Sequence, residues 1–359
     1  MSIWSDDRLL DLLQIEQAII QAPMAGSTSP ELAAAVSNSC AMGSLGCAMM
    51  GPDKVRDEIV ALRGATNRAF NINFFCHEPP GEDAIKNARA VELLQPFYDE
   101  NGLGEAPAVA ASNFPFDTAM LAVMLELQPR VVSFHFGMPE RHLVAPLRDA
   151  GIVVLCRATS VREAHHLQSM GVDAVIAQGF EAGGHRGDFA TSYEASCIGT
   201  MALVPQIVDA VTIPVIAAGG IADGRGIAAP LMLGASGGQI GTAFLSTNEA
   251  VVPDVYRDVI AAASEADTRM TRAFSGRPAR EIRNRFIDAM AGAQDELPDF
   301  PLLNTLTRPL RAASQRNGSA DLVSLWPGQA LTLNRSIAAA ALVDALVRET
   351  AEALSRHRI

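Results

Sequence analysis

The sequence predicts an α/β fold, namely a (β/α)8 TIM barrel that carries a smaller, mostly helical inserted domain. Two observations support this. Eight short apolar runs rich in Val, Ile and Ala alternate with longer segments of helical periodicity over roughly the first 250 residues. Glycine and polar residues recur at the carboxyl ends of these runs, and in a barrel those ends converge on one face. A doubly wound open sheet is the alternative.

The eight runs are expected to be the parallel strands of the barrel. They span residues 18–26, 41–48, 70–75, 131–137, 152–159, 174–180, 214–221 and 237–245. Helices are expected at 29–39, 51–64, 141–151, 160–171, 200–211 and 224–235. Several of these begin with Ser, Asp or Pro and end with Gly, which is typical of helix caps.

The chain is predicted to divide into two units. Residues 1–247 and 328–359 form the barrel, and residues 248–327, where helical pattern is weak and Pro and Gly are scattered, form the smaller helical domain on the substrate side. The amphipathic segment 336–357 is expected to pack back on the barrel as its closing helix.

Composition excludes several classes of function. The 359 residues carry a net charge of −12 and contain no long uncharged apolar tract, so we expect neither a nucleic-acid nor a membrane partner. No secretory signal is visible at the N-terminus, and a cytoplasmic protein is expected. The five cysteines show no metal-ligand spacing, which favours buried reduced thiols. A homodimer is one expectation, and the oligomeric state stays open.

Two glycine turns indicate a phosphate site. Gly219 and Gly220 end one apolar run in "PVIAAGGIADGRG", and Gly241 and Thr242 follow the next run in "GGQIGTAFL". Free backbone N–H groups at the start of a helix bind phosphate, and the loops after strands 7 and 8 are the usual place in a barrel. Either turn alone is also explained as a tight turn, but the pair in this order favours the phosphate site.

Polar side chains near other strand ends are candidates for a ligand site. Asn71 and Asn73 share one face of "FNINFF", and "QAPMAG" could line a flat ring system. Arg157, at the end of its strand, could neutralise a reduced flavin or an anionic substrate, and an ion pair with a carboxylate explains it equally well. His135 points away from Phe134 and Phe136, which favours a packed or supporting histidine.

His185 differs from the other histidines because it stands among glycines in "QGFEAGGHRG", directly after a predicted strand. A neutral imidazole on this face could accept a proton from an acidic carbon or hold an anionic substrate. The alternative is a loop histidine that is hydrogen-bonded to the backbone.

Taken together and in order, "QAPMAGSTSPELAAAVSNS", "FNINFF", "QGFEAGGHRG", "AAGGIADGRG", "QIGTAFL", "TRAFSGRPAR" and "LWPGQA" resemble the class I branch of the nitronate monooxygenase family, formerly called 2-nitropropane dioxygenases. The resemblance implies a barrel that binds flavin mononucleotide (FMN), with His185 as the active-site histidine. It implies flavin contacts by Asn71, Gln178 and Gly183, backbone of Ala22, Pro23 and Met24 facing the isoalloxazine, and an FMN phosphate at Gly219, Gly220, Gln239, Ile240, Gly241 and Thr242.

The activity implied by the resemblance is oxidation of alkyl nitronates, and for some members of neutral nitroalkanes, with O2 to an aldehyde or ketone plus nitrite. Two alternatives stay open. One is a related FMN barrel reductase that uses NAD(P)H to reduce a quinone or an enoyl thioester, and the other is a catalytically idle binding protein. The chain departs from the family pattern at Cys40 and Ala41, where a glycine pair is usual, and at Pro327, where Ala is usual.

Overall fold

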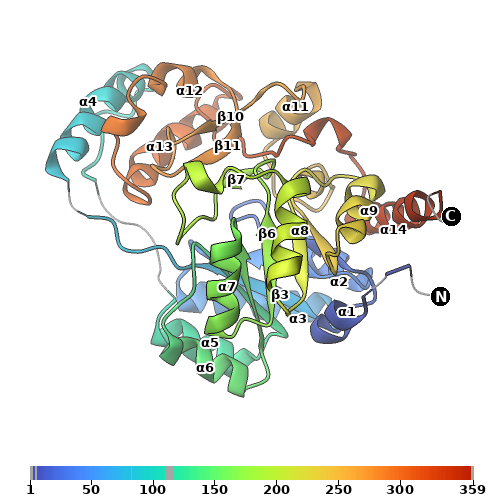
Figure 1. Ribbon diagram of the computed structural model, residues 1–359. Helices are drawn as coiled ribbons and strands as arrows, with labels where there is room; N and C mark the ends of the chain where they lie inside the picture. Colours follow the sequence, from blue (N-terminus) through green and yellow to red (C-terminus); the bar gives the residue numbers. More distant parts are fainter. Residues whose placement is uncertain (1–2, 5, 82, 110–115, 357–359) are drawn as a thin grey trace.

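Eight parallel strands form a closed barrel in the computed structural model, which describes residues 3–4, 6–81, 83–109 and 116–356 (Figure 1). The strands are β1 (Ile19–Gln21), β2 (Gly43–Gly46), β3 (Phe70–Phe75), β4 (Val131–His135), β5 (Val153–Ala158), β6 (Ala174–Gln178), β8 (Val215–Ala218) and β9 (Gly237–Ile240). They pair in the order β1-β9-β8-β6-β5-β4-β3-β2, and a parallel bridge between Ile20 and Met42 closes the ring. The predicted barrel is therefore confirmed, and the open sheet is excluded.

Helices cover the outside of the barrel (Figure 1). They are α2 (Pro30–Asn38), α3 (Pro52–Ala65), α5 (Thr118–Leu127), α6 (Arg141–Asp149), α7 (Val161–Met170), α8 (Thr200–Ala210), α9 (Gly224–Met232) and α14 (Ala339–Ser355). Side chains of Ser29, Asp117, Ser160 and Asp223 accept backbone N–H groups at the starts of α2, α5, α7 and α9. The C-terminal helix α14 packs on α9 and α2, as its amphipathic pattern predicts.

The amino-terminal end of the barrel is closed by apolar side chains. Leu9 and Leu13 of α1 (Arg8–Leu13) join Val131, Leu155 and Ile216 of the strands in one buried cluster. Leu9 lies close to Gly237, the first residue of β9, so α1 covers the amino ends of the strands. This end is a packed core, and the carboxyl ends of the strands remain for a ligand.

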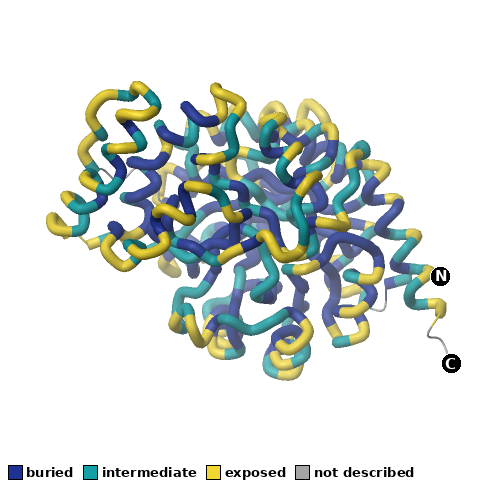
Figure 2. The backbone as a smooth tube through the Cα atoms, turned by 90° about the horizontal axis from the view of Figure 1, so that it is seen from above, coloured by how far each residue is buried: buried dark blue, intermediate teal, exposed yellow. Residues whose placement is uncertain are grey.

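A second unit lies over the carboxyl ends of the strands (Figure 1). Seen from above, exposed residues lie along the outer turns of the backbone and buried residues toward the middle (Figure 2). The second unit contains α4 (Ala84–Glu100), α11 (Asp254–Ala262), α12 (Arg285–Met290) and α13 (Leu302–Arg316). Its own buried cluster joins Ala90, Leu94 and Tyr98 of α4 to side chains between 273 and 322. The helix α4 thus packs in this unit although it precedes residue 248, and the predicted boundaries stay a prediction.

The second unit also contains a small antiparallel sheet that the sequence did not reveal. Its strands are β10 (Thr268–Thr271), β11 (Ala279–Ile282) and β7 (Gly184–His185), in the order β10-β11-β7. The two-residue strand β7 lies in the loop between β6 and α8 of the barrel, and His185 pairs with Ala279. A strand of two residues is too short to show any periodicity.

Gly43 tests how tightly α2 packs on the barrel. A Cβ atom at position 43 would lie 1.9 Å from the carbonyl oxygen of Ala33, in the backbone of α2. We expect Gly43→Ala to lower the free energy of unfolding by about 1–3 kcal/mol, because rigid backbone must move. Gly64→Ala is the matched control, since nothing lies within 4 Å of that position in α3, and alanine there should stabilise by about 0.5–1 kcal/mol. Urea unfolding midpoints measure both, and a Gly43→Ala midpoint equal to that of the wild type would contradict the packing.

Candidate active site

A cavity of about 680 Å³ opens at the carboxyl ends of the strands. Its wall is formed by barrel loops and by residues of the second unit. Most residues expected at the ligand site line it, namely Ala22, Pro23, Met24, Gln178, Gly183, His185, Gly219, Gly220, Gln239, Gly241 and Thr242. The structure thus brings together segments that lie up to 220 residues apart in the sequence.

Two of the expected cofactor contacts do not line the cavity. Asn71 is fully buried one layer deeper in the barrel, where its amide donates a 3.1 Å hydrogen bond to Ser44 Oγ. Asn73, two residues further along β3, lines the cavity instead. Ile240 packs its side chain in the main core, and its carbonyl oxygen accepts the N–H of Ala22.

Four inward-facing side chains form the polar floor of the cavity. Three of them come from the adjacent strands β4, β5 and β6, and one comes from β9. They are His135 at the end of β4, Arg157 in β5, Gln178 at the end of β6 and Gln239 in β9. Because side chains alternate along a strand, Phe134 packs in the core outside the barrel while His135 faces the cavity. Arg157 Nη1 lies 3.2 Å from His135 Nε2. The ion pair considered for Arg157 is not formed with any carboxylate of the described residues.

Gln178 is held at both ends of its side-chain amide. Its Nε2 donates to the carbonyl oxygen of His185 at 3.0 Å, and its Oε1 accepts the N–H of Gly187 at 2.8 Å. A Cβ atom at position 187 would lie 2.8 Å from both Arg157 Cδ and His135 Cε1. Glycine at 187 therefore lets the loop that carries His185 lie directly on the polar floor.

His185 is buried among aromatic rings at the boundary between the two units. Its ring centre lies 4.7 Å from Trp326 and 5.1 Å from Phe300, and its Nε2 lies 2.8 Å from Ser275 Oγ. Burial, followed by the nearby charge of Arg277, lowers the pKa of His185 to about 3. The imidazole is therefore neutral at physiological pH.

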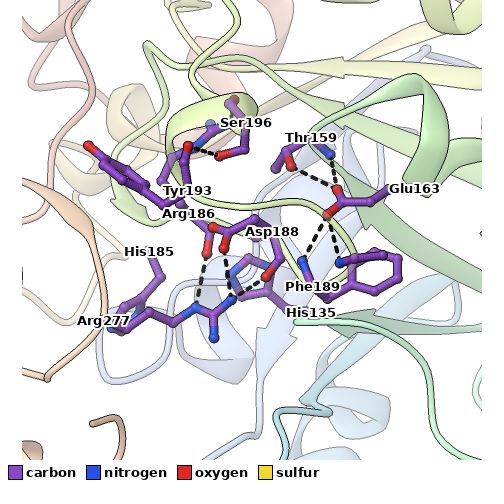
Figure 3. A network of polar contacts seen from close by, with 12 residues as sticks. His135, Thr159, Glu163, His185, Arg186, Asp188, Phe189, Tyr193, Ser196 and Arg277 are labelled. Atoms are coloured by element: carbon purple, nitrogen blue, oxygen red, sulfur yellow. Dashed lines mark hydrogen bonds and ion pairs between the residues drawn. The ribbon is translucent and has the colours of Figure 1, made fainter. Parts of the chain in front are cut away.

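A network of buried polar groups fixes the loop that follows His185 (Figure 3). Arg186 is fully buried and donates to the carbonyl oxygens of Gln178, Gly179 and Ser196. Glu163, at the start of α7, accepts four hydrogen bonds, from the backbone and side chain of Thr159 and from the N–H groups of Phe189 and Ala190. The Glu163 carboxylate and both terminal nitrogens of Arg186 have partners within the protein, and only Arg186 Nε has none, so we assign both residues a structural role.

Arg277 of the "FSGRPAR" segment attaches the second unit to this loop. Its guanidinium donates to the carbonyl oxygen of Asp188, and one of its nitrogen atoms lies 3.5 Å from the Asp188 carboxylate. The same guanidinium lies over the ring of Phe136, with 4.2 Å to the centroid. Phe136 has a φ of 70°, a left-handed conformation that is uncommon for a residue with a side chain. The stacked cation and the surrounding rings hold this conformation at the mouth of the barrel.

Two motif loops meet through their backbones at Gly183 and Gly328. A Cβ atom at 183 would lie 2.3 Å from the carbonyl oxygen of Trp326, and one at 328 would lie 2.7 Å from that of Glu181. Gln329 N–H donates to Glu181 O, and Gly328 N–H donates to Thr242 Oγ1. Glycine at 183 is thus required by contact with protein, whether or not a ligand also approaches it.

The region expected to bind phosphate contains two glycines in the left-handed conformation and the start of a short helix. Gly219 and Gly220 follow β8 with φ values of 109° and 71°, and the short helix α10 (Thr242–Leu245) follows β9. The run 237–245 is therefore a strand only as far as Ile240. In barrels, the loops after strands 7 and 8 with the first turn of a short extra helix form the usual phosphate site.

Several cavity residues escaped the sequence analysis. Tyr256 of α11 and Arg311 and Gln315 of α13 line the second unit's side of the cavity, together with Ser324 and Trp326. Arg311 donates to Asn304 and lies 3.3 Å from Ser324 Oγ. Of these, only Trp326 belongs to a recognised motif, "LWPGQA". Tyr256, Arg311 and Gln315 stand in ordinary helical patterns, and Ser324 lies in a loop. Cys40, Ala41 and Pro327, where the chain departs from the family pattern, do not line the cavity.

In the described part of the chain, no three His, Cys, Asp or Glu side chains are placed to hold a metal ion. Among the helices of the same residues, none is long and apolar enough to cross a membrane.

Comparisons with known proteins agree on one family. The nitronate monooxygenase family model matches residues 6–349. A nitronate monooxygenase from Pseudomonas aeruginosa is 43% identical over 348 residues, which cover 96% of this chain and 99% of the relative. The solved structure of a nitroalkane oxidase from Streptomyces ansochromogenes matches with a TM-score of 0.90 and 39% identity, over 98% of this chain and 100% of that chain. FabK from Thermotoga maritima matches with a TM-score of 0.75 and 30% identity, over 97% of each chain.

The lowered pKa of His185 predicts a loss of stability in acid. The unfolded chain takes up a proton on His185 near pH 6.5, whereas the folded protein does so only near pH 3, so folding is weakened as the pH falls through this range. Between pH 7 and pH 5, we expect His185→Asn to lose about 2 kcal/mol less unfolding free energy than the wild type.

Urea unfolding at the two pH values measures this difference. His142→Asn is the matched control, since it makes the same substitution at a side chain that is 63% exposed. Parallel pH profiles for wild type and His185→Asn would contradict the buried neutral imidazole.

Proposed function

The chain belongs to the nitronate monooxygenase family, and from this premise we propose that its cavity binds FMN and that His185 handles the acidic proton or the anion of the substrate. The protein is an oxidoreductase that oxidises alkyl nitronates. The observation that carries the proposal is the neutral imidazole of His185, which lines the cavity at the barrel mouth and is backed by aromatic rings and by Ser275.

The residues present fit FMN in two respects. Gly219, Gly220 and the first turn of α10 lie where a barrel usually binds phosphate, and their backbone N–H groups would bind it there. On the floor, Gln239 Oε1 is buried and has no hydrogen-bond partner, and Arg157 Nε likewise has none. A ring with both N–H and C=O groups, such as the pyrimidine ring of a flavin, would provide partners for both. When bound, FMN would supply the electron acceptor.

The hydrogen bonds of Ser275 suggest which nitrogen of His185 is available. The Ser275 hydroxyl donates to the carbonyl oxygen of Arg277 at 3.3 Å, so we assign its oxygen as the acceptor of the N–H on His185 Nε2. The proton then resides on Nε2, and Nδ1 is the basic atom. This residue would remove the α-proton from a neutral nitroalkane and would only need to bind a preformed nitronate.

The positive charges around His185 favour binding of an anionic substrate and disfavour protonation of the imidazole. Arg277, Arg157 and Arg311 all contribute to its lowered pKa. Arg311, which lines the cavity, would stabilise a nitronate there, whereas an imidazole with a pKa of about 3 is a weak base toward a neutral nitroalkane. We therefore propose that nitronates are the better substrates of this protein.

His185→Asn tests the assigned role. We expect turnover of a neutral nitroalkane to fall by a factor of about 10², the low end of the usual contribution of a general base, because the imidazole is a weak base, while FMN stays bound. Turnover of the preformed nitronate should fall less, because no proton is removed. Oxygen consumption measures turnover of the neutral nitroalkane and of the nitronate, and the visible flavin absorbance measures how much FMN stays bound.

Ser275→Ala is the matched variant, because it keeps the imidazole and removes only its hydrogen-bond partner. A loss of about 2-fold to 10-fold on the neutral substrate is expected, which corresponds to one hydrogen bond. Unchanged turnover of the neutral nitroalkane in His185→Asn would refute the base role.

The reductase alternative is tested without oxygen. The match to FabK is weaker than that to the nitroalkane oxidase in both identity and TM-score. We expect an alkyl nitronate to bleach the bound flavin under anaerobic conditions, and NADH to do so much more slowly. Rapid bleaching by NADH with no response to nitronate would favour the reductase.

A further inference from the structure

Arg157 is the only Lys or Arg in the eight barrel strands, all of whose residues the structure describes. Its guanidinium lies at the polar floor of the cavity, where the strand ends converge. A positive charge at this depth is costly unless an anion or several acceptors surround it.

The protein itself gives Arg157 little compensation. Nη1 meets His135 Nε2 at 3.2 Å, and Nε is buried without a partner. Burial keeps His135 neutral by holding its pKa well below the usual value, so this partner brings no negative charge. Among the described residues, no carboxylate forms an ion pair with Arg157, and the nearby Arg186 is another cation. Arg186, by contrast, has three carbonyl oxygens as acceptors.

Arg157 lies on the barrel side of the cavity, opposite the wall that the second unit forms. Gly187 lies against the side chains of Arg157, His135 and Gln178. A Cβ atom at position 187 would lie within 3.1 Å of an atom of each of them. Gln178 is one of the residues proposed to contact the flavin. The other partly exposed arginine of the cavity, Arg311, comes from α13 and lies beside Ser324 and Asn304.

We propose that Arg157 is the counter-charge of the reduced flavin ring, and that it raises the reduction potential of bound FMN by stabilising the reduced anion relative to the neutral oxidised ring. This inference rests on the proposed binding of FMN. The two-electron-reduced isoalloxazine is a weak acid whose anion carries its charge on the pyrimidine side of the ring. A fixed charge near that side is one of the means by which a protein tunes a flavin.

The test compares the midpoint potential of bound FMN in wild type, Arg157→Met and Arg157→Lys, each as holoprotein, by reductive titration against a reference dye. Loss of the charge should weaken the preference for reduced over oxidised FMN at least tenfold, which for a two-electron couple lowers the potential by about 30 mV. The lysine variant should retain most of the wild-type potential. If Arg157→Met does not fold, Arg157→Gln gives the same comparison.

Arg311→Met is the matched control, because it removes a cation that also lines the cavity but belongs to the second unit. Its flavin potential should stay near that of the wild type. An equal fall of the potential in Arg311→Met would overturn the inference, because Arg157 would then be only part of a general positive field. An unchanged potential in Arg157→Met with only the KM for nitronate raised would also overturn it, because Arg157 would then be a substrate contact. Wild-type protein that binds no FMN would overturn the proposed function as well, which distinguishes the two failures.

Discussion

The contact between the backbones of residues 181–184 and 326–329 determines how the cavity is built. Gly183 and Gly328 each lie where a Cβ atom would strike the other segment's main chain. The first segment leaves the barrel after β6, and the second returns from the second unit. Gly328 also donates to Thr242, which begins the short helix after β9. One contact therefore fixes the His185 loop, the proposed phosphate region and the Trp326 wall relative to one another.

The molecule as a whole is negatively charged, whereas the charged side chains near His185 are positive. The chain as a whole carries a net charge of −12, whereas Arg157, Arg277 and Arg311 surround His185. Surface charges are screened over about 8 Å at physiological ionic strength, but partly buried charges are screened much less. Recognition of a small anion is therefore local to the cavity, and the acidic surface contributes little to it. Burial of the imidazole, and after it the charges of these arginines, keep His185 neutral, so proton chemistry depends in part on the charges that attract an anion.

The sequence predicted the barrel well because its signals are periodic and repeated. Each apolar run contains a strand, and the glycine turns lie at the carboxyl ends of β8 and β9. The second unit was harder to predict, since β7 has two residues and α4 joins its core from a distant part of the chain. Burial depth was also hidden: Asn71 and Asn73 share one strand face, but only Asn73 reaches the cavity. Tyr256 and Arg311 are brought to the cavity by tertiary packing alone, and no local pattern marks them.

The placement of His185 on β7 has a consequence for how such a protein can change during evolution. The strand is inserted in a barrel loop, yet its backbone pairs with β11 of the second unit, and Ser275 and Phe300 of that unit contact the imidazole. The histidine is thus encoded with one unit and oriented by the other. A lineage could not exchange the second unit for an unrelated one without rebuilding the surroundings of this residue. The two units are therefore expected to be inherited together, as a single catalytic module.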